Sequence, residues 1–552
     1  MQDKIIVNFE NGLKKEYDNG ITYYEVSKDY QENMASKIIG VKVNNEIIPM
    51  NNKVKDNDQV RFFDASDLNG YKMNQSGLKF VLEVALKETF GKEYDVTFDH
   101  SIARGLHMTI DSNEPFGKEE TNKLKEAMQK LIDDDEIITA LHVAKKEAIN
   151  YYTKTNNIEK AENIHNVMND VVSVYRLKTY INYFYSEMPY STGCLNKFDL
   201  VCLADRKLVL LFPTKKAVNE IPAYVNYESV IKCFKEGKNW LRAMGIPYVA
   251  DLNKQISASN IENIIRATEI NFDNAIHDIV DEIIKKGAKY VMLAGPSSSG
   301  KTTSTKKIAL ALRARGYEPL ILSVDNYFKD REDSPKDENG NYDFECMEAL
   351  DLDLLNDHLK RLNNNEEVDI PEYNFILGEK EYHNDPIKLG NKGIILMEGL
   401  HCINDDMTKD IDNNLKYKIY LSPFTPLNID KHNYVSTVDL RLIRRMVRDN
   451  RTRGTNVSKT IGYWQTVRSG EEKYIFPFIN GADKILNTSL VYEIGVLKVY
   501  AEPLLYSVSI DSPYYEEARR LLKFLRGFFP ISSDYVSKDS ILREFIGGSS
   551  FE

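Results

Sequence analysis

A predicted phosphate-binding loop constrains the fold of this chain more than any other feature of its sequence. Residues 295–302 read GPSSSGKT, which fits the pattern G-x4-G-K-[ST] of loops that bind nucleotide phosphates. The apolar run 290–294 before the loop predicts a buried parallel strand, and the helix-forming residues 301–315 after it predict a helix. Because the motif lies between a strand and a helix, we expect a P-loop in an α/β domain.

The residues of this loop are expected to hold the phosphates of ATP. Gly295 and Gly300 permit the turns that direct backbone N–H groups at phosphate oxygens, and the following helix adds its positive end. Lys301 would reach the β- and γ-phosphates, and Thr302 would offer its hydroxyl to Mg²⁺. The predicted nucleotide-binding residues are Gly295, Pro296, Ser297, Ser298, Ser299, Gly300, Lys301, Thr302 and Thr303.

Two acidic residues follow further predicted strands. The apolar run 319–324 ends at Asp325, and the run 393–397 ends at Glu398. In an open α/β sheet, residues just past the carboxyl ends of parallel strands face the ligand crevice. One carboxylate can hold Mg²⁺ while the other accepts a proton from an attacking hydroxyl, as phosphoryl transfer to an alcohol requires. The sequence therefore predicts a phosphotransferase site at this edge of the sheet.

An arginine-rich stretch follows near residue 450. Positioned guanidinium groups stabilise the negative charge that spreads over phosphoryl oxygens during transfer. The alternative is a basic helix that is solvated on one face and salt-bridged on the other, and Arg441 and Arg451 fit this alternative better than the rest. The stretch contains Arg441, Arg444, Arg445, Arg448, Arg451 and Arg453.

Length and composition predict several globular domains. The 552 residues exceed what one hydrophobic core supports, and 42% apolar with 28% charged residues is typical of globular proteins. A net charge of −11 argues against broad attachment to nucleic acid or to a membrane surface. No apolar run reaches the ~20 residues of a membrane span, the start lacks a signal-peptide pattern, and five scattered cysteines are expected to be reduced thiols. These observations predict a cytoplasmic location.

The pattern of the chain divides it into five parts. Residues 1–66 alternate in short strands with Asn-Gly turns, which predicts a small β-rich domain. Residues 67–215 mix helical and strand patterns and predict an α+β domain, and residues 216–286 are mainly helical and predict a connector. Residues 287–510 contain the P-loop and its neighbours. Residues 511–552 form a C-terminal tail with one helical pattern and no motif.

Several motifs of the P-loop part resemble the uridine kinase and phosphoribulokinase family. They are DNYFK at 325–329, IPEYNF at 370–375, MEGL at 397–400 and RLIRRMVRD at 441–449. The resemblance covers residues 287–510 and implies a kinase that uses ATP and Mg²⁺. The full arrangement resembles bacterial nucleoside-kinase-like proteins in which TGS and synthetase-like domains precede such a kinase.

The resemblance assigns roles to individual residues. Asp325 matches the general base toward the nucleoside 5′-hydroxyl, and Glu398 matches the acid associated with Mg²⁺. Glu345 matches the residue that holds the ribose hydroxyls, with Asp343 as a gapped alternative, and Tyr373 matches a tyrosine of the nucleoside pocket. The arginines that match those closing over substrate and phosphates are Arg445, Arg448 and Arg453. Together with Asp325 and Lys301, these arginines are the predicted catalytic residues.

Three departures from the family pattern leave the acceptor open. Gly378 stands where uridine kinases carry a histidine against the base, Thr455 where they carry an arginine, and Tyr463 where they carry a pocket glutamine. The loss of a buried hydrogen-bond partner costs ~1–3 kcal/mol and redirects specificity. A phosphorylated sugar is therefore an alternative acceptor.

The front half resembles parts of threonyl-tRNA synthetases. Residues 1–66 resemble the TGS domain, a ubiquitin-like fold, and residues 67–215 resemble the domain that follows TGS in those enzymes. His100, His107 and Cys194 lack the spacing of the family's editing-site metal ligands. This departure implies that the editing chemistry is lost and that both histidines are ordinary structural or surface residues.

We therefore expect a multidomain α/β protein. Its C-terminal part would be a P-loop NTPase fold on a parallel sheet, preceded by an N-terminal β-grasp domain and a central α+β domain. The expected activity is transfer from ATP to the 5′-hydroxyl of a ribonucleoside, and the alternative is an ATP-binding regulatory module that binds RNA or protein. An excess of acidic residues in 1–66 disfavours RNA. No membrane partner is expected, and homo-oligomerisation is left open.

Overall fold

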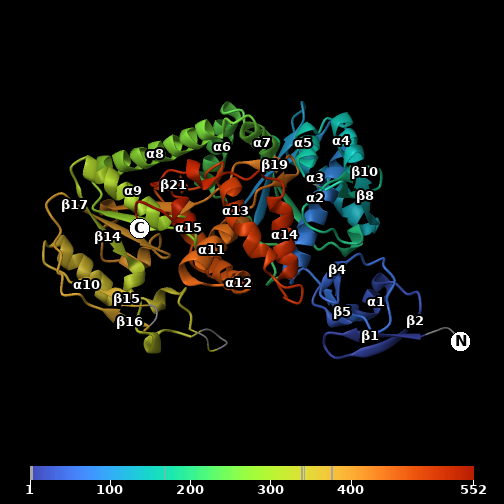
Figure 1. Cartoon of the computed structure of the whole chain (residues 1–552), viewed down its shortest axis with the longest axis horizontal. Helices are drawn as coiled ribbons and strands as arrows, with labels where there is room; N and C mark the ends of the chain where they lie inside the picture. Colours follow the sequence, from blue (N-terminus) through green and yellow to red (C-terminus); the bar gives the residue numbers. More distant parts are fainter. Residues whose placement is uncertain are drawn as a thin grey trace.

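The computed structural model describes residues 4–102, 104–167, 169–336, 340, 342–374 and 377–551. Phe375, at the end of the predicted motif 370–375, lies outside the described residues. The domains follow one another along an elongated body, with the N-terminal domain at one end and the P-loop sheet at the other (Figure 1). Within the described ranges, the helices are too short or too polar to cross a membrane.

Residues 4–63 form a mixed sheet against which one helix packs. The strand order is β2-β1-β5-β3-β4, and β1 and β5 run parallel in the middle of the sheet. Val7, Val26, Val41 and Val60 are buried between helix and sheet. This arrangement is the predicted β-grasp fold. Its elements are β1 (Lys4–Phe9), β2 (Lys14–Asp18), α1 (Tyr23–Tyr30), β3 (Gly40–Val43), β4 (Glu46–Ile48) and β5 (Gln59–Phe63).

The second domain packs two antiparallel sheets around a long buried helix, α2. The sheets have the orders β11-β12-β7-β6 and β10-β9-β8. The domain is α+β, as expected. Its elements are α2 (Leu68–Phe90), β6 (Asp95–Ile102), β7 (Gly105–Asp111), α3 (Lys118–Asp133), β8 (Ile138–Ala144), α4 (Lys145–Lys154), α5 (Ile158–Asn166), β9 (Val171–Leu177), β10 (Tyr180–Asn182), β11 (Asp199–Ala204) and β12 (Lys207–Leu211).

His100 and His107 are buried neighbours on paired strands of this domain. They face each other across β6 and β7, and their ring centroids are 4.9 Å apart. Phe234 stacks on the other face of His100 at 3.9 Å. Among the described residues, these histidines do not belong to a group of His, Cys, Asp and Glu side chains close enough to hold a metal ion.

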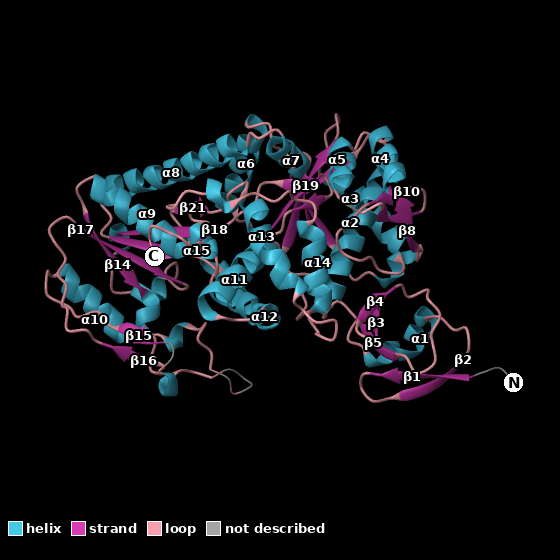
Figure 2. Cartoon of the chain, viewed as in Figure 1, coloured by secondary structure: helices cyan, strands magenta, loops and turns pink. Residues whose placement is uncertain are grey.

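Three helices connect this domain to the P-loop sheet. They are α6 (Glu228–Ala243), α7 (Val249–Ser257) and α8 (Ile261–Lys286). Helix α8 runs along one side of the molecule from α7 to the sheet (Figures 1 and 2). Its buried face carries Ile276, Ile279, Val280 and Ile283. The helix therefore belongs to the core of the P-loop part as well as to the connection.

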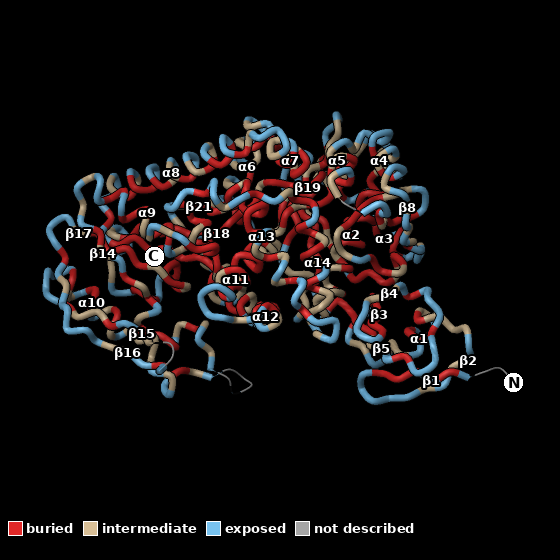
Figure 3. The backbone as a smooth tube through the Cα atoms, in the orientation of Figure 1, coloured by how far each residue is buried: buried red, intermediate tan, exposed pale blue. Residues whose placement is uncertain are grey.

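The C-terminal half is built on a five-stranded parallel sheet with the order β14-β17-β13-β18-β21. Alternate residues of the central strand enter opposite cores: Val291 and Leu293 pack with α8 and α9, whereas Met292 packs with α6 and α10. The sheet is thus covered on both faces, and its strands β13 and β18 are buried along their whole length (Figure 3). Its elements are β13 (Tyr290–Ala294), α9 (Lys301–Ala314), β14 (Glu318–Ser323), α10 (Leu352–Asn363), β17 (Gly393–Gly399), β18 (Lys416–Ser422), β21 (Lys484–Asn487) and α13 (Glu493–Tyr506).

Smaller elements surround this sheet. One hairpin contacts the turn that follows β14, and the other contacts α5, α7 and β6; two helices follow, and the tail adds two more. The hairpins are β15 (Glu372–Asn374) with β16 (Glu379–Glu381), and β19 (Asn428–Asp430) with β20 (Asn433–Tyr434). The helices are α11 (Thr437–Arg453), α12 (Val457–Tyr474), α14 (Tyr515–Leu525) and α15 (Arg543–Ile546).

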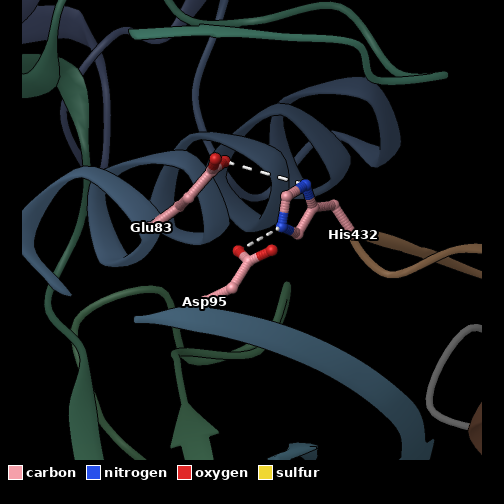
Figure 4. A group of neighbouring side chains, drawn as sticks. All are labelled: Glu83, Asp95 and His432. Carbon is pink, nitrogen blue, oxygen red and sulfur yellow. Dashed lines mark hydrogen bonds and ion pairs between the residues drawn. The ribbon is translucent and has the colours of Figure 1, made fainter. Parts of the chain in front are cut away.

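Charged side chains join the second domain to the sheet domain. His432, in the β19–β20 turn, lies between Glu83 of α2 and Asp95 of β6 (Figure 4). Its Nε2 is 3.0 Å from Asp95 and its Nδ1 is 3.9 Å from Glu83. The ammonium of Lys87 pairs with Glu83 at 2.7 Å and with Asp95 at 3.5 Å. Lys431 of the same turn also pairs with Asp95, at 3.7 Å. Because Lys87 and Lys431 share these carboxylates, the group is an ion-pair network that ties the two domains together.

Candidate active site

The P-loop joins β13 to α9 and has the backbone that a phosphate cradle needs. Ser298 and Gly300 have φ angles of 58° and 87°, so two residues of the loop are left-handed. Glycine takes this conformation without strain, which explains Gly300. Lys301 Nζ donates to the carbonyl oxygens of Gly295 at 3.0 Å and Pro296 at 3.4 Å. The ammonium therefore lies against the first two residues of the loop.

Side chains from outside the loop hold its carbonyl groups. Arg441 Nε donates to Ser297 O at 2.9 Å, and the Thr488 hydroxyl donates to Ser299 O at 2.6 Å. Arg445 Nη1 also donates to the Ser297 hydroxyl at 3.0 Å. Since the carbonyls are held from behind, the loop amides are left to face a ligand.

The loop fits the phosphates of a nucleotide. The hydroxyl oxygens of Ser298 and Ser299 are buried and have no hydrogen-bond partner in the described part of the chain. Among the described residues, no carboxylate lies within ion-pair distance of Lys301. Buried polar groups are normally satisfied, so an anionic ligand with oxygen acceptors matches these hydroxyls and this ammonium.

Asp325 and Glu398 meet beside Lys301. Asp325 lies in the turn that follows β14, and Glu398 lies near the end of β17, where it pairs in register with Leu293 of β13. Burial raises the pKa of Asp325, and the Lys301 ammonium opposes that rise. Burial likewise raises the pKa of Glu398 to about 7, with Lys301 opposing and Asp325 adding to the rise. A hydrogen bond with Thr302 links Glu398 to the loop, so Thr302 and Glu398 together fit a hard cation such as Mg²⁺.

Glu345, and not Asp343, shares the electrostatic environment of this pair. Burial raises the pKa of Glu345 to about 7, Glu471 adds to the rise, and Arg445 and Lys301 oppose it. Asp343 accepts the backbone N–H of Glu345 at 3.1 Å. The ungapped match is thus the residue that is directed toward the P-loop, while Asp343 supports the backbone that presents it.

Tyr373 lies next to the turn that carries Asp325. Its backbone N–H donates to Asn326 Oδ1 at 3.4 Å, and its ring packs on Phe328 with centroids 5.6 Å apart. Nearby, a Cβ atom at Gly378 would lie 2.9 Å from the side chain of Arg331. Arg331 therefore occupies the space that a histidine at position 378 would need.

The six arginines do not form one group. Arg441 and Arg444 are buried and paired with Glu471 and Glu493, so both brace the loop from within the core. Each guanidinium pairs with a buried carboxylate and donates to a carbonyl group, so both arginines fit the salt-bridged alternative, which the sequence already favoured for Arg441. Arg451 donates to carbonyl groups of the tail.

The other three arginines surround one buried carboxylate. Asp449 pairs with Arg445 at 3.2 Å, Arg448 at 2.8 Å and Arg453 at 3.7 Å. The spacing of 445, 449 and 453 by four residues puts them on one helix face, a signal that the sequence contained. Asp449 thus holds these arginines together, and Arg445 among them contacts the loop through Ser297.

The C-terminal tail supplies a carboxylate that the sequence did not indicate. Glu544 Oε2 accepts the backbone N–H of Thr303 at 3.2 Å and its hydroxyl at 2.8 Å. Ile541 packs against Gly300, where a Cβ atom would lie 2.3 Å from its side chain. Residues 541–544 therefore lie directly on the start of α9.

Comparison with known proteins agrees with this geometry. The model of the Phosphoribulokinase / Uridine kinase family matches residues 290–492. The chain is 30% identical over 204 residues to the uridine kinase of Anoxybacillus flavithermus, a match that covers 37% of this chain and 87% of that kinase. The chain belongs to this family. Its kinase domain follows a front region that is 24% identical over 201 residues to the threonine–tRNA ligase of Caldanaerobacter subterraneus, covering 36% of this chain and 31% of that ligase.

Among solved structures, this family member is similar to the D-glycerate 3-kinase from Cryptococcus neoformans var. grubii. The identity is 12% and the TM-score is 0.29, and the match covers 38% of this chain and 90% of that kinase.

Glu345 and Glu398 should make the stability of this kinase depend on pH. Both have an ordinary pKa of 4.5, which folding raises to about 7. The folded state then retains protons that the unfolded state loses. Stability from this source is complete below pH 4.5 and lost as the pH rises through 7. We expect Glu398→Gln to remove ~3 kcal/mol of the difference in unfolding free energy between about pH 5 and about pH 8.

Urea denaturation at both pH values measures this difference. Glu348→Gln, at an exposed position of the loop that carries Glu345, is the control and should leave the difference unchanged. An equal pH dependence in the parent and in Glu398→Gln would contradict the prediction.

Proposed function

We propose that this kinase transfers the γ-phosphoryl group of ATP to the 5′-hydroxyl of a ribonucleoside with Mg²⁺. The observation that carries the proposal is the placement of Asp325 and Glu398 at the carboxyl ends of the paired strands β14 and β17, at the edge of the sheet where β13 leads into the P-loop. Lys301 and the loop amides would orient the phosphates. Thr302 and Glu398 would hold Mg²⁺, which when bound neutralises charge on the phosphate oxygens.

The proposed roles of the acidic groups follow from their surroundings. Burial raises the pKa of Asp325, and a carboxylate with a raised pKa is a stronger base toward a hydroxyl proton. Glu345 would accept hydrogen bonds from the ribose hydroxyls, with Tyr373 as a wall of the same pocket. This division leaves one carboxylate for the proton, one for the sugar and one for the metal.

The arginines would act on the charge that develops during transfer. Arg445, Arg448 and Arg453 share Asp449, and this carboxylate keeps the three cations close together, with Arg445 on the loop. Guanidinium groups in such positions are worth ~10³-fold or more in rate in phosphoryl transfer.

A screen with Mg·ATP and the common ribonucleosides tests the proposal. We expect one or more nucleosides to yield a 5′-monophosphate, detected by chromatography with ADP formed in equal amount. Phosphorylated sugars form the second panel, because the family includes acceptors of both kinds. Turnover of a phosphorylated sugar alone would reassign the acceptor, and ATP binding without turnover of any acceptor would contradict an enzyme.

An ATP-binding regulatory module is the second candidate. The packing of Arg331 over Gly378 favours it, because this packing fills space that a base-contacting histidine would need. In this proposal, the occupancy of the P-loop would be reported to the front domains.

We propose that residues 1–66 are a TGS domain and that residues 67–215 are the synthetase-like domain. Residues 216–286 would be the connector, 287–510 the kinase domain and 511–552 the tail.

A further inference from the structure

A cavity of about 340 Å³ lies between the second domain and the kinase domain. We call it the junction cavity. It is lined by α2 and β6 on one side and by α11, α12 and the carboxyl end of β18 on the other. Asp325, Lys301 and Glu398 do not line it. Its volume is within the ~300–1,000 Å³ of small-molecule sites, and it is separate from the candidate active site.

The wall of the junction cavity has an excess of positive charge. Its three acidic residues are each paired locally: Glu517 with Lys72 at 2.7 Å, Asp439 with Arg520 at 2.7 Å and Glu472 with Arg468 at 3.6 Å. Four other basic side chains of the wall have no carboxylate within ion-pair distance among the residues described. These are Lys79, Arg104, Lys215 and Lys216.

Buried polar groups on the wall also lack partners. Both ring nitrogens of His100 and the indole nitrogen of Trp464 are buried without a hydrogen bond in the described chain. The ammonium of Lys79 is buried, and its hydrogen bond to the His432 carbonyl is long, at 3.4 Å. Burial lowers the pKa of Lys79 and that of Lys215 to about 8. An anion that accepts hydrogen bonds would satisfy the donors among these groups, which are one N–H of His100, the indole N–H of Trp464 and the ammonium of Lys79.

Aromatic side chains define the rest of the ligand. Tyr434, Trp464 and Phe476 line the junction cavity together with the cations. Flat rings bind aromatic walls by stacking, and phosphate oxygens bind ammonium and guanidinium groups. We propose that the junction cavity binds a mononucleotide, a phosphate joined to a planar base, as an effector of the kinase domain.

The cavity is connected to the P-loop by hydrogen-bonded arginines. Arg441 lines the cavity, pairs with Glu471 and donates to Ser297 O of the loop at 2.9 Å. Arg468 also lines the cavity and pairs with the same Glu471 at 2.7 Å. An anion that binds either guanidinium would weaken its ion pair with Glu471 and alter the hydrogen bond from Arg441 to the loop. The effector would thereby change the nucleotide site.

Fluorescence of Trp464 tests the site directly. The chain has two tryptophans, so Trp240→Phe leaves Trp464 as the single reporter. We expect AMP to change its fluorescence saturably, adenosine and inorganic phosphate each to act far more weakly, and Lys79→Met to weaken AMP binding about tenfold. Lys301→Met should bind AMP as well as the parent does.

Other outcomes overturn the proposal. The proposal fails if Trp464 fluorescence does not change at millimolar AMP, or if adenosine changes it as much as AMP does. It also fails if Lys79→Met leaves the change unaltered. A change that is lost in Lys301→Met would place AMP at the P-loop. Lys79→Met removes a desolvated cation and should fold. Thermal unfolding checks this, and AMP should raise the melting temperature of the parent more than that of the variant.

The contact between the tail and the P-loop carries a second inference. Glu544 accepts two hydrogen bonds from Thr303 in the first turn of α9, and Lys307 pairs with Asp539 at 3.4 Å. Figure 1 shows α15 and the C-terminus beside α9, far from the N-terminal domain. The first turn of a helix after a P-loop is where phosphate oxygens bind. A carboxylate of the chain is therefore bound where a nucleotide phosphate would bind.

We also infer that residues 539–551 are an autoinhibitory segment, which a nucleotide must displace from Thr303. The inference rests on nucleotide binding by the P-loop and not on the acceptor. We expect Glu544→Gln to tighten the binding of fluorescent mant-ADP with Mg²⁺ about tenfold, since a charge-assisted contact that competes with the ligand is weakened. Hydrogen exchange in residues 539–551 should rise when ADP is added to the parent.

Asp534→Asn is the matched control, because Asp534 lies in the same tail and, among the described residues, its side chain bonds within its own turn, to Ser532. It should leave mant-ADP affinity unchanged. Unchanged or weaker binding in Glu544→Gln, or an ADP-induced fall in exchange of the tail, would show that the segment forms part of the nucleotide site and would overturn the inference. Failure of both variants and the parent to bind mant-ADP would instead overturn the nucleotide site itself.

Discussion

An Asp325→Asn variant should transfer phosphate about 10²–10⁴-fold more slowly than the parent while binding ATP equally well. The carboxylate lies after β14 beside Lys301, and burial raises its pKa. An amide of the same shape cannot accept the hydroxyl proton, but it leaves the P-loop contacts intact. Single-turnover rates with the nucleoside found by the screen, together with ATP affinity by calorimetry, measure the two effects separately.

The matched control for this variant is Asp333→Asn. Asp333 is exposed on the segment that follows Asp325, so its replacement should leave both quantities unchanged. Turnover by Asp325→Asn at the parent rate would assign the base to another group, with Glu345 the next candidate. A parallel loss of ATP affinity would indicate that Asp325 binds the metal rather than the proton.

Replacing Arg444 with methionine should cost about 3–5 kcal/mol of unfolding free energy. Its guanidinium is fully buried, pairs with Glu493 at 2.7 Å and donates to Thr488 O at 2.7 Å. Without it, the Glu493 carboxylate is left buried and unpaired, and the segment behind the P-loop loses a brace. Urea denaturation measures the loss, and the remaining folded protein should bind ATP more weakly.

Two further variants distinguish a buried pair from a general loss of packing. Arg315→Met breaks the pair with Asp281, whose carboxylate is 65% exposed, and should cost at most ~1 kcal/mol. Adding Glu493→Gln to Arg444→Met should restore part of the lost stability, because the uncompensated charge disappears. A double variant that is less stable than Arg444→Met would contradict this explanation.

Local sequence patterns were sufficient for the framework of the kinase domain. The apolar run 290–294 is β13 as predicted, and the predicted helix after the loop ends at Ala314, one residue early. Both elements can be predicted from neighbouring residues, because a buried parallel strand is a continuous apolar run and a helix repeats its apolar residues about every 3.6 positions. The same rule about strand ends correctly brought Asp325 and Glu398 together, since parallel strands deliver their carboxyl ends to one edge.

What the sequence could not supply were contacts between distant segments. Arginines in one run have the same local pattern, and only packing decided that Arg441 and Arg444 pair with buried glutamates while Arg445 faces the loop. The tail carries no motif, yet Glu544 reaches Thr303 over 241 residues of chain.

By itself, then, the sequence determined that this chain has a P-loop with two carboxylates beside it, because each of those features is encoded within a few residues. The tertiary structure decided which arginines brace the P-loop, which carboxylate contacts the start of α9, and where a cavity opens between domains. Pairing, burial and cavities depend on which surfaces meet when the domains pack, and residue order does not state this.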